Sequence, residues 1–357
     1  MKVKKLQLID FRNQPERTVV PESDVTVFTG PNGCGKTNLV EAIYCASIGK
    51  SFRTSQMEDL IGFGKDEAAV FLDFTLRNVE HKIRVRLSRK EGLRFFVNDT
   101  KIRRKDLLGT FRTVLFTPDE LRLIKGAPQD RRRFLDLEVS QVSPRYYEEI
   151  LRYTRAVSQR NAALRQAQIS GKKPDIDMWD MQIAQGAAYI VKKRLETVAR
   201  MNEILPQMEQ AITGGKETLA VEYLMGKDES GEKSESWYLE RLARAREEDA
   251  RLCRTSVGPH RDDLQFMLDG HDIARFGSQG QQRTAILAMK LSEMEFIRHE
   301  TGEYPVLLLD DIGSELDETR RKSLFAFLEQ GNIQAFVTSA EYSAVGVGEE
   351  IKVAIKN

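Results

Sequence analysis

The stretch GPNGCGKT at residues 30–37 decides the fold of this 357-residue chain. It matches the pattern GxxxxGK[ST] in full, and it lies between an apolar, β-rich run at 25–28 and a helical run at 38–43. Strand, glycine loop and helix therefore follow one another in the order of a phosphate-binding loop, which indicates an α/β protein.

The glycines of this stretch allow the backbone to turn N–H groups toward phosphate oxygens, and the following helix adds partial positive charge at its N-terminus. Lys36 is expected to reach the terminal phosphates of ATP and to take part in catalysis. Thr37 is expected to bind Mg²⁺ through its hydroxyl. The predicted nucleotide-binding residues of the loop are Gly30, Pro31, Asn32, Gly33, Cys34, Gly35, Lys36 and Thr37.

The second half of such a site is an apolar strand that ends in carboxylates, and VLLLDD at 306–311 supplies it. About 270 residues separate Thr37 from Asp310 along the chain. The two strands should lie near each other in a parallel sheet, so both ends of the chain are expected to build one ATPase core. Asp310 is predicted to support Mg²⁺ and Asp311 to act as general base. The alternative for Asp311 is a cap on the next turn.

The composition indicates a globular protein. Apolar residues make up 41% of the chain, which is ample for packed cores, and 357 residues are enough for two domains. Lysine and arginine (55) nearly balance aspartate and glutamate (54). The resulting net charge of +1 argues neither for nor against a nucleic-acid partner.

Cysteine usage and hydropathy favour the cytoplasm. The three cysteines, at 34, 45 and 253, form no CxxC pair and indicate neither disulfides nor zinc. No apolar run approaches the roughly 18 residues that a membrane helix needs, and the opening MKVKKLQLIDF alternates like a strand. We expect a soluble, cytoplasmic protein with no membrane partner.

Hydrophobic periodicity divides the rest of the chain. Period-two alternation at 69–116 predicts an antiparallel β meander appended to the core. Three- and four-residue spacing from 128 to 212, broken at 171–174, predicts a helical hairpin, and the polar stretch at 226–236 indicates an exposed loop. The predicted domains are 1–125 (ATPase head, N-terminal part), 126–252 (helical lid) and 253–357 (ATPase head, C-terminal part).

A glycine loop does not by itself distinguish transporters, GTPases, kinases and DNA motors, so the stretch FGSQGQQR at 276–283 matters more. Its serine and glycines open a helix and make a second anion-binding surface. One chain cannot easily fold both surfaces around one γ-phosphate. We therefore expect two chains to face head to tail, with Ser278, Gly280 and Gln281 completing in trans the nucleotide site of the partner. The alternative is an ordinary turn and helix start.

Two further stretches complete the expected site. SELD at 314–317 follows the carboxylates and is expected to lie across the interface of such a dimer. Thr338 ends a strand at 334–339, where a polar side chain is placed to sense the γ-phosphate, and it is counted among the predicted catalytic residues.

Together these blocks resemble the ABC-type ATPase heads of the SMC class and, within that class, the RecF family of bacterial recombinational repair proteins. The resemblance spans nearly the whole chain, whose length fits a short hairpin in place of the long coiled coil of an SMC protein. The blocks, in the family's order, are FRN at 11–13, GPNGCGKTNLVEAI at 30–43, FTPDEL at 116–121, KGAPQDRRRFLD at 125–136, GPHRDDL at 258–264, SQGQQRT at 278–284 and LLLDDIGSELD at 307–317.

The resemblance implies an ABC-type P-loop ATPase head with an antiparallel β subdomain, and a mainly helical lid domain that contains the hairpin. It implies weak ATP hydrolysis with Mg²⁺ and an ATP-driven homodimeric clamp on duplex, gapped or single-stranded DNA. It also implies RecO and RecR as partners in the loading of RecA, in replication restart and in the SOS response.

Some departures from related patterns leave points open. Gln14 and Pro15 stand where the family usually carries an aromatic residue, which leaves the adenine contact unassigned. Asp311 replaces the glutamate that is common in ABC enzymes, and its shorter reach is expected to slow water activation. The ATPase subunit of an ABC transporter is the main alternative, although FTPDEL lacks a glutamine for the transporter glutamine loop. A kinase or GTPase that acts without a partner subunit is a further alternative, although the sequence contains no NKxD guanine-reading motif.

Contacts outside the loop depend on basic residues. Arg12 is a candidate phosphate contact, and the alternative is a solvated side chain after a strand. Clusters at 103–105, 131–133 and 192–194 are candidates to track the DNA backbone, which is read through charge. A solvated helix face is the alternative for each cluster.

Overall fold

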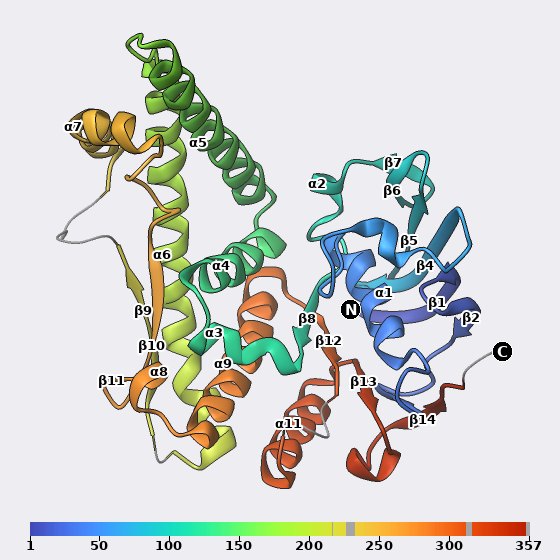
Figure 1. The fold of residues 1–357 in the computed structure, drawn as a ribbon. Coiled ribbons are helices and arrows are strands. Elements are labelled where there is room, and N and C mark those ends of the chain that lie inside the picture. Colours follow the sequence, from blue (N-terminus) through green and yellow to red (C-terminus); the bar gives the residue numbers. More distant parts are fainter. Residues whose placement is uncertain (216, 226–232, 312–315, 355–357) are drawn as a thin grey trace. The chain divides into compact units, whose positions relative to one another are not determined.

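The computed structural model describes the chain except residues 216, 226–232, 312–315 and 355–357 (Figure 1). Most of the predicted loop at 226–236 and positions 314 and 315 of the predicted interface stretch lie outside the described residues. The chain divides into two compact units. The head unit comprises residues 1–121, 204–217 and 278–357, and the helical unit comprises residues 122–203 and 218–277.

A five-stranded parallel sheet, in the order β14-β3-β13-β12-β8, forms the core of the head unit. Its mainly apolar strands read as continuous runs because they are covered on both faces. β13 pairs with both β3, which leads into the glycine loop, and β12, which leads to Asp310. The expectation that both ends of the chain build one core is confirmed. The strands are β3 (Val25–Thr29), β8 (Thr113–Phe116), β12 (Val306–Leu309), β13 (Ala335–Ser339) and β14 (Glu349–Lys352).

A six-stranded antiparallel sheet, in the order β2-β1-β4-β5-β6-β7, contains the opening strand and the predicted meander up to residue 102. The last part of the predicted meander, residues 113–116, is instead β8 of the parallel sheet, because it pairs with β12. A bulge between Val3 and Lys5 shifts the pairing, so that Val3, Leu6 and Leu8 are buried while Lys4 is exposed. The strands are β1 (Lys2–Phe11), β2 (Gln14–Val19), β4 (Glu67–Leu76), β5 (Val79–Ser88), β6 (Gly92–Val97) and β7 (Thr100–Ile102).

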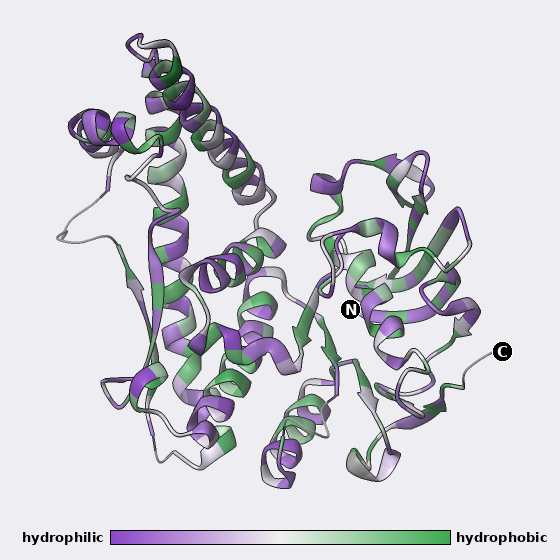
Figure 2. Cartoon of the chain, viewed as in Figure 1, coloured by the Kyte–Doolittle hydropathy of each residue, from purple (hydrophilic) through white to green (hydrophobic). Residues whose placement is uncertain are grey.

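The first helix, α1 (Lys36–Ile48), contacts β13 of the parallel sheet and β4 of the antiparallel sheet. Residues 38–48 are all buried, which fixes the helix directly behind the glycine loop. In Figure 2 the strands β8 and β12 are coloured hydrophobic, in keeping with a core in this unit. The other helices of the head unit are η1 (Met57–Leu60), α2 (Arg104–Leu107), η2 (Pro118–Glu120), α9 (Gln279–Thr301), α11 (Glu318–Gly331) and η3 (Tyr342–Ala344).

The helical unit is built on the predicted hairpin of α5 (Pro144–Ser170) and α6 (Asp177–Thr213), which lie side by side in Figure 1. Arg160 of α5 pairs with Asp180 of α6 at 2.6 Å, which confirms the hairpin. Ser143 caps α5, and Gly171 ends it with a φ of 67°. The other elements are α3 (Leu121–Lys125), α4 (Pro128–Val142), α7 (Glu235–Leu252), α8 (Ile273–Phe276), β9 (Leu219–Leu224), β10 (Asp263–Leu268) and β11 (His271–Asp272).

The unit boundaries differ from the predicted domains at three places. The sequence assigns residues 122–125 to the head, but they belong to the helical unit. The sequence assigns residues 253–277 to the head, but they belong to the helical unit because β10 pairs with β9 along its length. The sequence assigns residues 204–213 to the lid, but this last part of α6 belongs to the head unit. None of the helices in the described ranges is long and apolar enough to span a bilayer.

Candidate nucleotide-binding site

The glycine loop joins β3 to α1 with three glycines at positive φ: Gly30 at 146°, Gly33 at 83° and Gly35 at 101°. A Cβ at Gly30 would clash with the carbonyl oxygen of Val353. A Cβ at Gly35 would clash with the side chains of the FRN segment and of Gln14. Conformation and space therefore both require glycine at positions 30 and 35.

Lys36 holds its ammonium group over the loop. Its Nζ donates to the carbonyl oxygens of Gly30 at 2.6 Å and Pro31 at 3.1 Å. Phosphate oxygens are charged and accept stronger hydrogen bonds than neutral carbonyls do, so a phosphate group can take over these bonds.

One carboxylate oxygen joins the two ends of the chain. Asp310 Oδ1 accepts hydrogen bonds from Thr37 Oγ1 at 2.8 Å and from Thr338 Oγ1 at 2.7 Å. Burial raises the pKa of Asp310, and the two donated hydrogen bonds oppose that shift. The N–H of Asp311 donates to Thr338 Oγ1 at 2.8 Å, and Asp311 itself is exposed. The structure thus brings these four predicted residues together.

The oxygens at this junction fit Mg²⁺. The ion takes hard oxygen ligands and commonly binds one or two protein groups together with substrate phosphates and water. Thr37 Oγ1 and Asp310 Oδ1 are oxygens of this kind, and they lie 2.8 Å apart. The loop and the acidic strand can therefore hold Mg²⁺ next to a bound triphosphate.

Arg12 lines the site and is held by a carboxylate of α1. Its Nε and Nη2 donate to the two carboxylate oxygens of Glu41 at 3.0 and 2.8 Å, and its Nη1 donates to the carbonyl of Asp59 at 2.9 Å. Glu41 is fully buried, so this bidentate pair fixes the guanidinium in place. The alternative of a solvated Arg12 is wrong, and its contact with phosphate stays a prediction.

Amide side chains hold the backbone of the glycine loop through hydrogen bonds. Asn13 Nδ2 donates to the carbonyl of Gly33 at 2.9 Å, and Gln14 Nε2 donates to the carbonyl of Cys34 at 3.1 Å. Asn38 Nδ2 donates to Asn13 Oδ1 at 2.7 Å. The sequence analysis missed these roles, for which the position of FRN at the end of the first strand was the one available signal.

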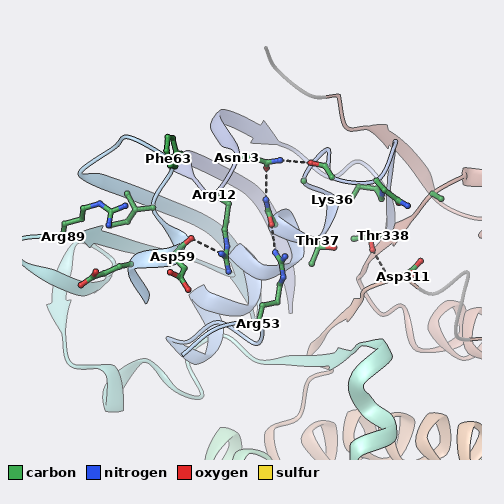
Figure 3. A pocket seen from close by; sticks show the side chains of 17 residues that line it. Arg12, Asn13, Lys36, Thr37, Arg53, Asp59, Phe63, Arg89, Asp311 and Thr338 are labelled. Atoms are coloured by element: carbon green, nitrogen blue, oxygen red, sulfur yellow. Dashed lines mark hydrogen bonds between the residues drawn. The ribbon is translucent and has the colours of Figure 1, made fainter. Parts of the chain in front are cut away.

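A pocket of about 850 Å³ lies at this site and is shown in Figure 3. The predicted residues that line it are Arg12, Asn32, Gly33, Gly35, Lys36, Thr37, Asp311 and Thr338. Arg53 donates from its Nη1 to Asn38 Oδ1 at 2.8 Å and also lines the pocket. Lining residues that the sequence analysis missed are Asn13, Asn38, Arg53, Glu58, Asp59, Ile61, Phe63, Arg89 and Ala340. Most of them lie in irregular segments that carry no periodicity or motif.

Ser278, Gly280 and Gln281, which are predicted to act in trans, lie at the start of α9 and outside the lining of this pocket. Ser278 Oγ accepts from the N–H of Gln281 at 3.2 Å, and Gln281 Oε1 accepts from the N–H of Ser278 at 2.8 Å. The Gly280 carbonyl accepts from Arg320 of α11 at 2.9 Å. The side chain of Ser278 is exposed. Local capping thus explains the residue types, and their action in trans stays a prediction.

Two of the three basic clusters do not form continuous basic faces. Arg131 makes two hydrogen bonds to Asp263, at 2.7 and 2.8 Å. Arg194 is buried and pairs with Asp136 at 2.8 Å. Only part of each cluster is therefore available to a phosphate backbone, and DNA contact there stays a prediction.

Comparisons with known proteins agree with this geometry. The chain matches the family model "RecF/RecN/SMC N terminal domain" over residues 2–356. The protein named DNA replication and repair protein RecF from Shouchella clausii is 39% identical over 347 residues, covering 95% of this chain and 93% of its own. Its namesake from Clostridium perfringens is 37% identical over 339 residues, covering 95% and 92%.

A solved structure described as the recombination mediator protein RecF with ATP in the RecFOR pathway superposes with a TM-score of 0.90 at 32% identity. The match covers 99% of this chain and 95% of that one. An SMC head bound to the C-terminal winged-helix domain of ScpA shares the fold, with a TM-score of 0.60 at 16% identity. With a family match over almost its whole length and these relatives, the chain belongs to the RecF family of the RecF/RecN/SMC proteins.

Proposed function

We propose that this chain is an ATP-dependent DNA-binding protein of recombinational repair that acts as a homodimeric clamp. ATP closes the dimer on duplex, gapped or single-stranded DNA, and hydrolysis opens it. The observation that carries this proposal is the junction at Asp310, where a loop hydroxyl and a strand carboxylate from opposite ends of the chain meet. Family membership supports the repair role.

Hydrolysis is assigned to the residues around this junction. Lys36 binds the terminal phosphates, and Thr37 with Asp310 holds Mg²⁺, which supplies positive charge that stabilises phosphoryl transfer. Asp311 is exposed beside the Thr338 hydroxyl and acts as general base toward the attacking water. Its side chain is one methylene shorter than glutamate, so turnover is slow.

The position of the second predicted anion-binding surface supports the homodimer. Ser278, Gly280 and Gln281 lie outside the lining of the pocket in their own chain. In the clamp they reach the nucleotide that the partner's loop holds, so ATP connects the two subunits. DNA then occupies the closed dimer through contacts with its phosphate backbone.

The proposed protein partners are RecR and RecO, with which the clamp directs RecA to gapped DNA in replication restart and the SOS response, in the cytoplasm. The relatives named above as RecF, one of them described within the RecFOR pathway, support this assignment. The alternative of an ABC transporter subunit is not favoured, because the curated relatives that match over more than nine tenths of their length are repair proteins.

The substitution Ser278→Asp tests the dimer. Aspartate caps helices as well as serine does, so α9 keeps its start, while the added negative charge repels a γ-phosphate. We expect wild-type protein to shift toward a dimer when Mg·ATP is added in light-scattering gel filtration. The variant should keep ATP affinity close to wild type and show no shift.

The matched control is Ser143→Asp, the same exchange at the cap of α5. It should dimerise like wild type. Equal ATP-driven dimerisation of Ser278→Asp would contradict the clamp.

A further inference from the structure

One large hydrophobic side chain stands fully in solvent at the edge of the pocket. Phe63 is 104% exposed, more than any other large hydrophobic residue in the described part of the chain. It is also the one aromatic residue that lines the pocket there. Leaving a phenyl ring in water forgoes the free energy of its burial, so a ring held in this position is suited to cover an incoming ligand.

The segment around Phe63 is hydrogen-bonded to the end of β1 and to Arg12, which follows it. The N–H of Gly62 donates to the carbonyl of Asp10 at 2.7 Å, and the N–H of Arg12 donates to the carbonyl of Leu60 at 2.8 Å. The N–H of Lys65 closes the turn on the carbonyl of Gly62 at 3.0 Å. Backbone hydrogen bonds on both sides therefore hold the exposed ring beside the pocket.

The pocket carries Lys36 on one side and Phe63 on the other. Lys36, Arg12, Arg53 and Arg89 supply its positive charge, and in the view of Figure 3 Arg12 lies between Lys36 and Phe63, with Arg89 on the Phe63 side. Glu58 and Asp59 line the pocket from the segment that leads to Phe63. Carboxylates repel phosphate but accept hydrogen bonds from N–H and O–H groups, such as an exocyclic amine or ribose hydroxyls. A nucleotide is thereby oriented with its triphosphate at Lys36 and its base toward Phe63.

The side chains of Asn13 and Gln14 bind the phosphate loop and are not available to contact a base. Gln14 is buried, and its amide donates to the carbonyl of Cys34. Asn13 donates to the carbonyl of Gly33 and accepts from Asn38. These side chains brace the phosphate loop and present no ring to a base. The base contact that the sequence left unassigned is therefore to be sought in another segment.

We propose that Phe63 is the base-stacking residue of this pocket, with the purine ring of the bound nucleotide lying on its phenyl face. The inference rests on the proposed binding of ATP at Lys36 and names the residue that recognises the other end of that ligand. Stacking on an aromatic side chain tolerates any base, and Glu58 and Asp59 on the same segment offer acceptors to N–H and O–H groups of the nucleotide.

The experiment compares a ligand that has a base with one that has none. Calorimetric titration with Mg·ATP and with Mg·tripolyphosphate is carried out on wild type, Phe63→Ala and Phe63→Tyr. We expect Phe63→Ala to weaken ATP binding about tenfold or more, as loss of a base–aromatic stack does, and to leave tripolyphosphate binding unchanged. Phe63→Tyr keeps a ring and should bind ATP like wild type.

The matched control is Ile169→Ala, which removes an exposed apolar side chain (83%) from the end of α5 and should change neither affinity. Equal weakening of both ligands by Phe63→Ala, or none of either, would overturn the base-stacking inference while the proposed function stands. Unchanged ATP affinity with lost dimerisation would assign Phe63 to the second copy and overturn it as well. Wild type that binds neither ligand would overturn the proposed function and this inference with it.

Discussion

The Thr338 hydroxyl makes different contacts with the two adjacent residues Asp310 and Asp311. It donates to Asp310 Oδ1 at 2.7 Å and accepts from the N–H of Asp311 at 2.8 Å. Asp310 is buried and receives two hydroxyl donors, whereas Asp311 is exposed. A group that binds one carboxylate and the backbone of the next acidic residue should matter more for turnover than for nucleotide affinity.

Thr338→Val removes the hydroxyl and keeps the shape of the side chain. We expect ATP turnover to fall at least tenfold with ATP affinity nearly unchanged, because the lost contacts orient catalytic groups. Loss of one donor to a buried carboxylate should also destabilise the head unit by about 1–3 kcal/mol in urea unfolding. Thr338→Ser keeps the hydroxyl and should retain turnover. Wild-type turnover in Thr338→Val would show that the hydroxyl has no catalytic role.

Residues whose spacing is dictated by chemistry could be predicted from the sequence. The glycine loop and the strand ending in Asp310 carry signals that depend on a few adjacent positions, and the structure brings them together. Phe63 and Arg53 follow no period, and their relation to the loop arises from pairing with the first strand and with α1. The residues adjacent to Phe63 and Arg53 in the sequence do not reveal this pairing, so the two could not be predicted as pocket residues.

At the scale of elements, buried ion pairs fix how the helices of the helical unit pack against one another. Arg160 of α5 donates to Asp180 of α6 at 2.6 Å and to Asp249 of α7 at 2.7 Å. Both carboxylates and the guanidinium are almost completely buried. Because a guanidinium needs acceptors in fixed directions, this cluster sets the relative positions of three helices.

A half-buried histidine connects α5 with the segment that follows α7. Tyr153 of α5 donates to His260 Nδ1 at 2.5 Å, and His260 Nε2–H donates to the carbonyl of Thr255 at 3.0 Å. Burial lowers the pKa of His260 to about 4, with Arg261 and Arg132 adding to the shift while the Thr255 hydrogen bond and Asp249 oppose it. The imidazole is therefore neutral in the folded protein above that pH.

This pKa predicts how stability depends on pH. The unfolded chain has a His pKa of about 6.5, so it takes up a proton before the folded chain does as the pH falls. The contribution of neutral His260 is complete above about pH 6.5 and declines by up to about 3 kcal/mol toward pH 4. Urea unfolding of wild type and His260→Asn should show a stability difference that shrinks across this window.

Carboxylates that titrate in the same window act on both proteins and cancel in the difference. His81→Asn, the same exchange in β5 of the head unit, serves as a second reference. A wild-type advantage over His260→Asn that stays constant from pH 7 to 4 would rule out the neutral imidazole.

The element scale is also where sequence reasoning failed. The period-two and helical patterns located the meander and the hairpin, since each depends on neighbouring residues. The assignment of residues 253–277 failed because β10 pairs with β9, which is distant in sequence and short. Two short strands with ordinary alternation fit either unit until their partners are known.

At the scale of the whole molecule, the two predicted anion-binding surfaces of one chain differ in their relation to the pocket. The loop with Lys36 lines the pocket, and the start of α9 with Ser278 does not. With a net charge of +1 the chain has little overall attraction for nucleotide or DNA, so binding depends on these local arrangements. In a head-to-tail dimer each complete site takes its loop from one subunit and its helix start from the other.

Composite sites predict that two inactive variants restore activity when mixed. Lys36→Ala removes the loop cation, and Ser278→Asp removes the surface offered to the partner. In the mixed dimer, the loop of the Ser278→Asp subunit faces the helix start of the Lys36→Ala subunit, and both are intact. Neither variant closes a dimer with itself because its sites all lack one half, so the closed dimers are mixed and carry one intact site of two, and we expect up to about half of wild-type ATP turnover. Neither variant alone, nor a mixture of Lys36→Ala with Thr37→Ala, should recover it, because both of those changes fall on the loop. A mixture of Lys36→Ala and Ser278→Asp that stays inactive, with mixed dimers confirmed by affinity capture of a tagged subunit, would show that the nucleotide is completed within one chain.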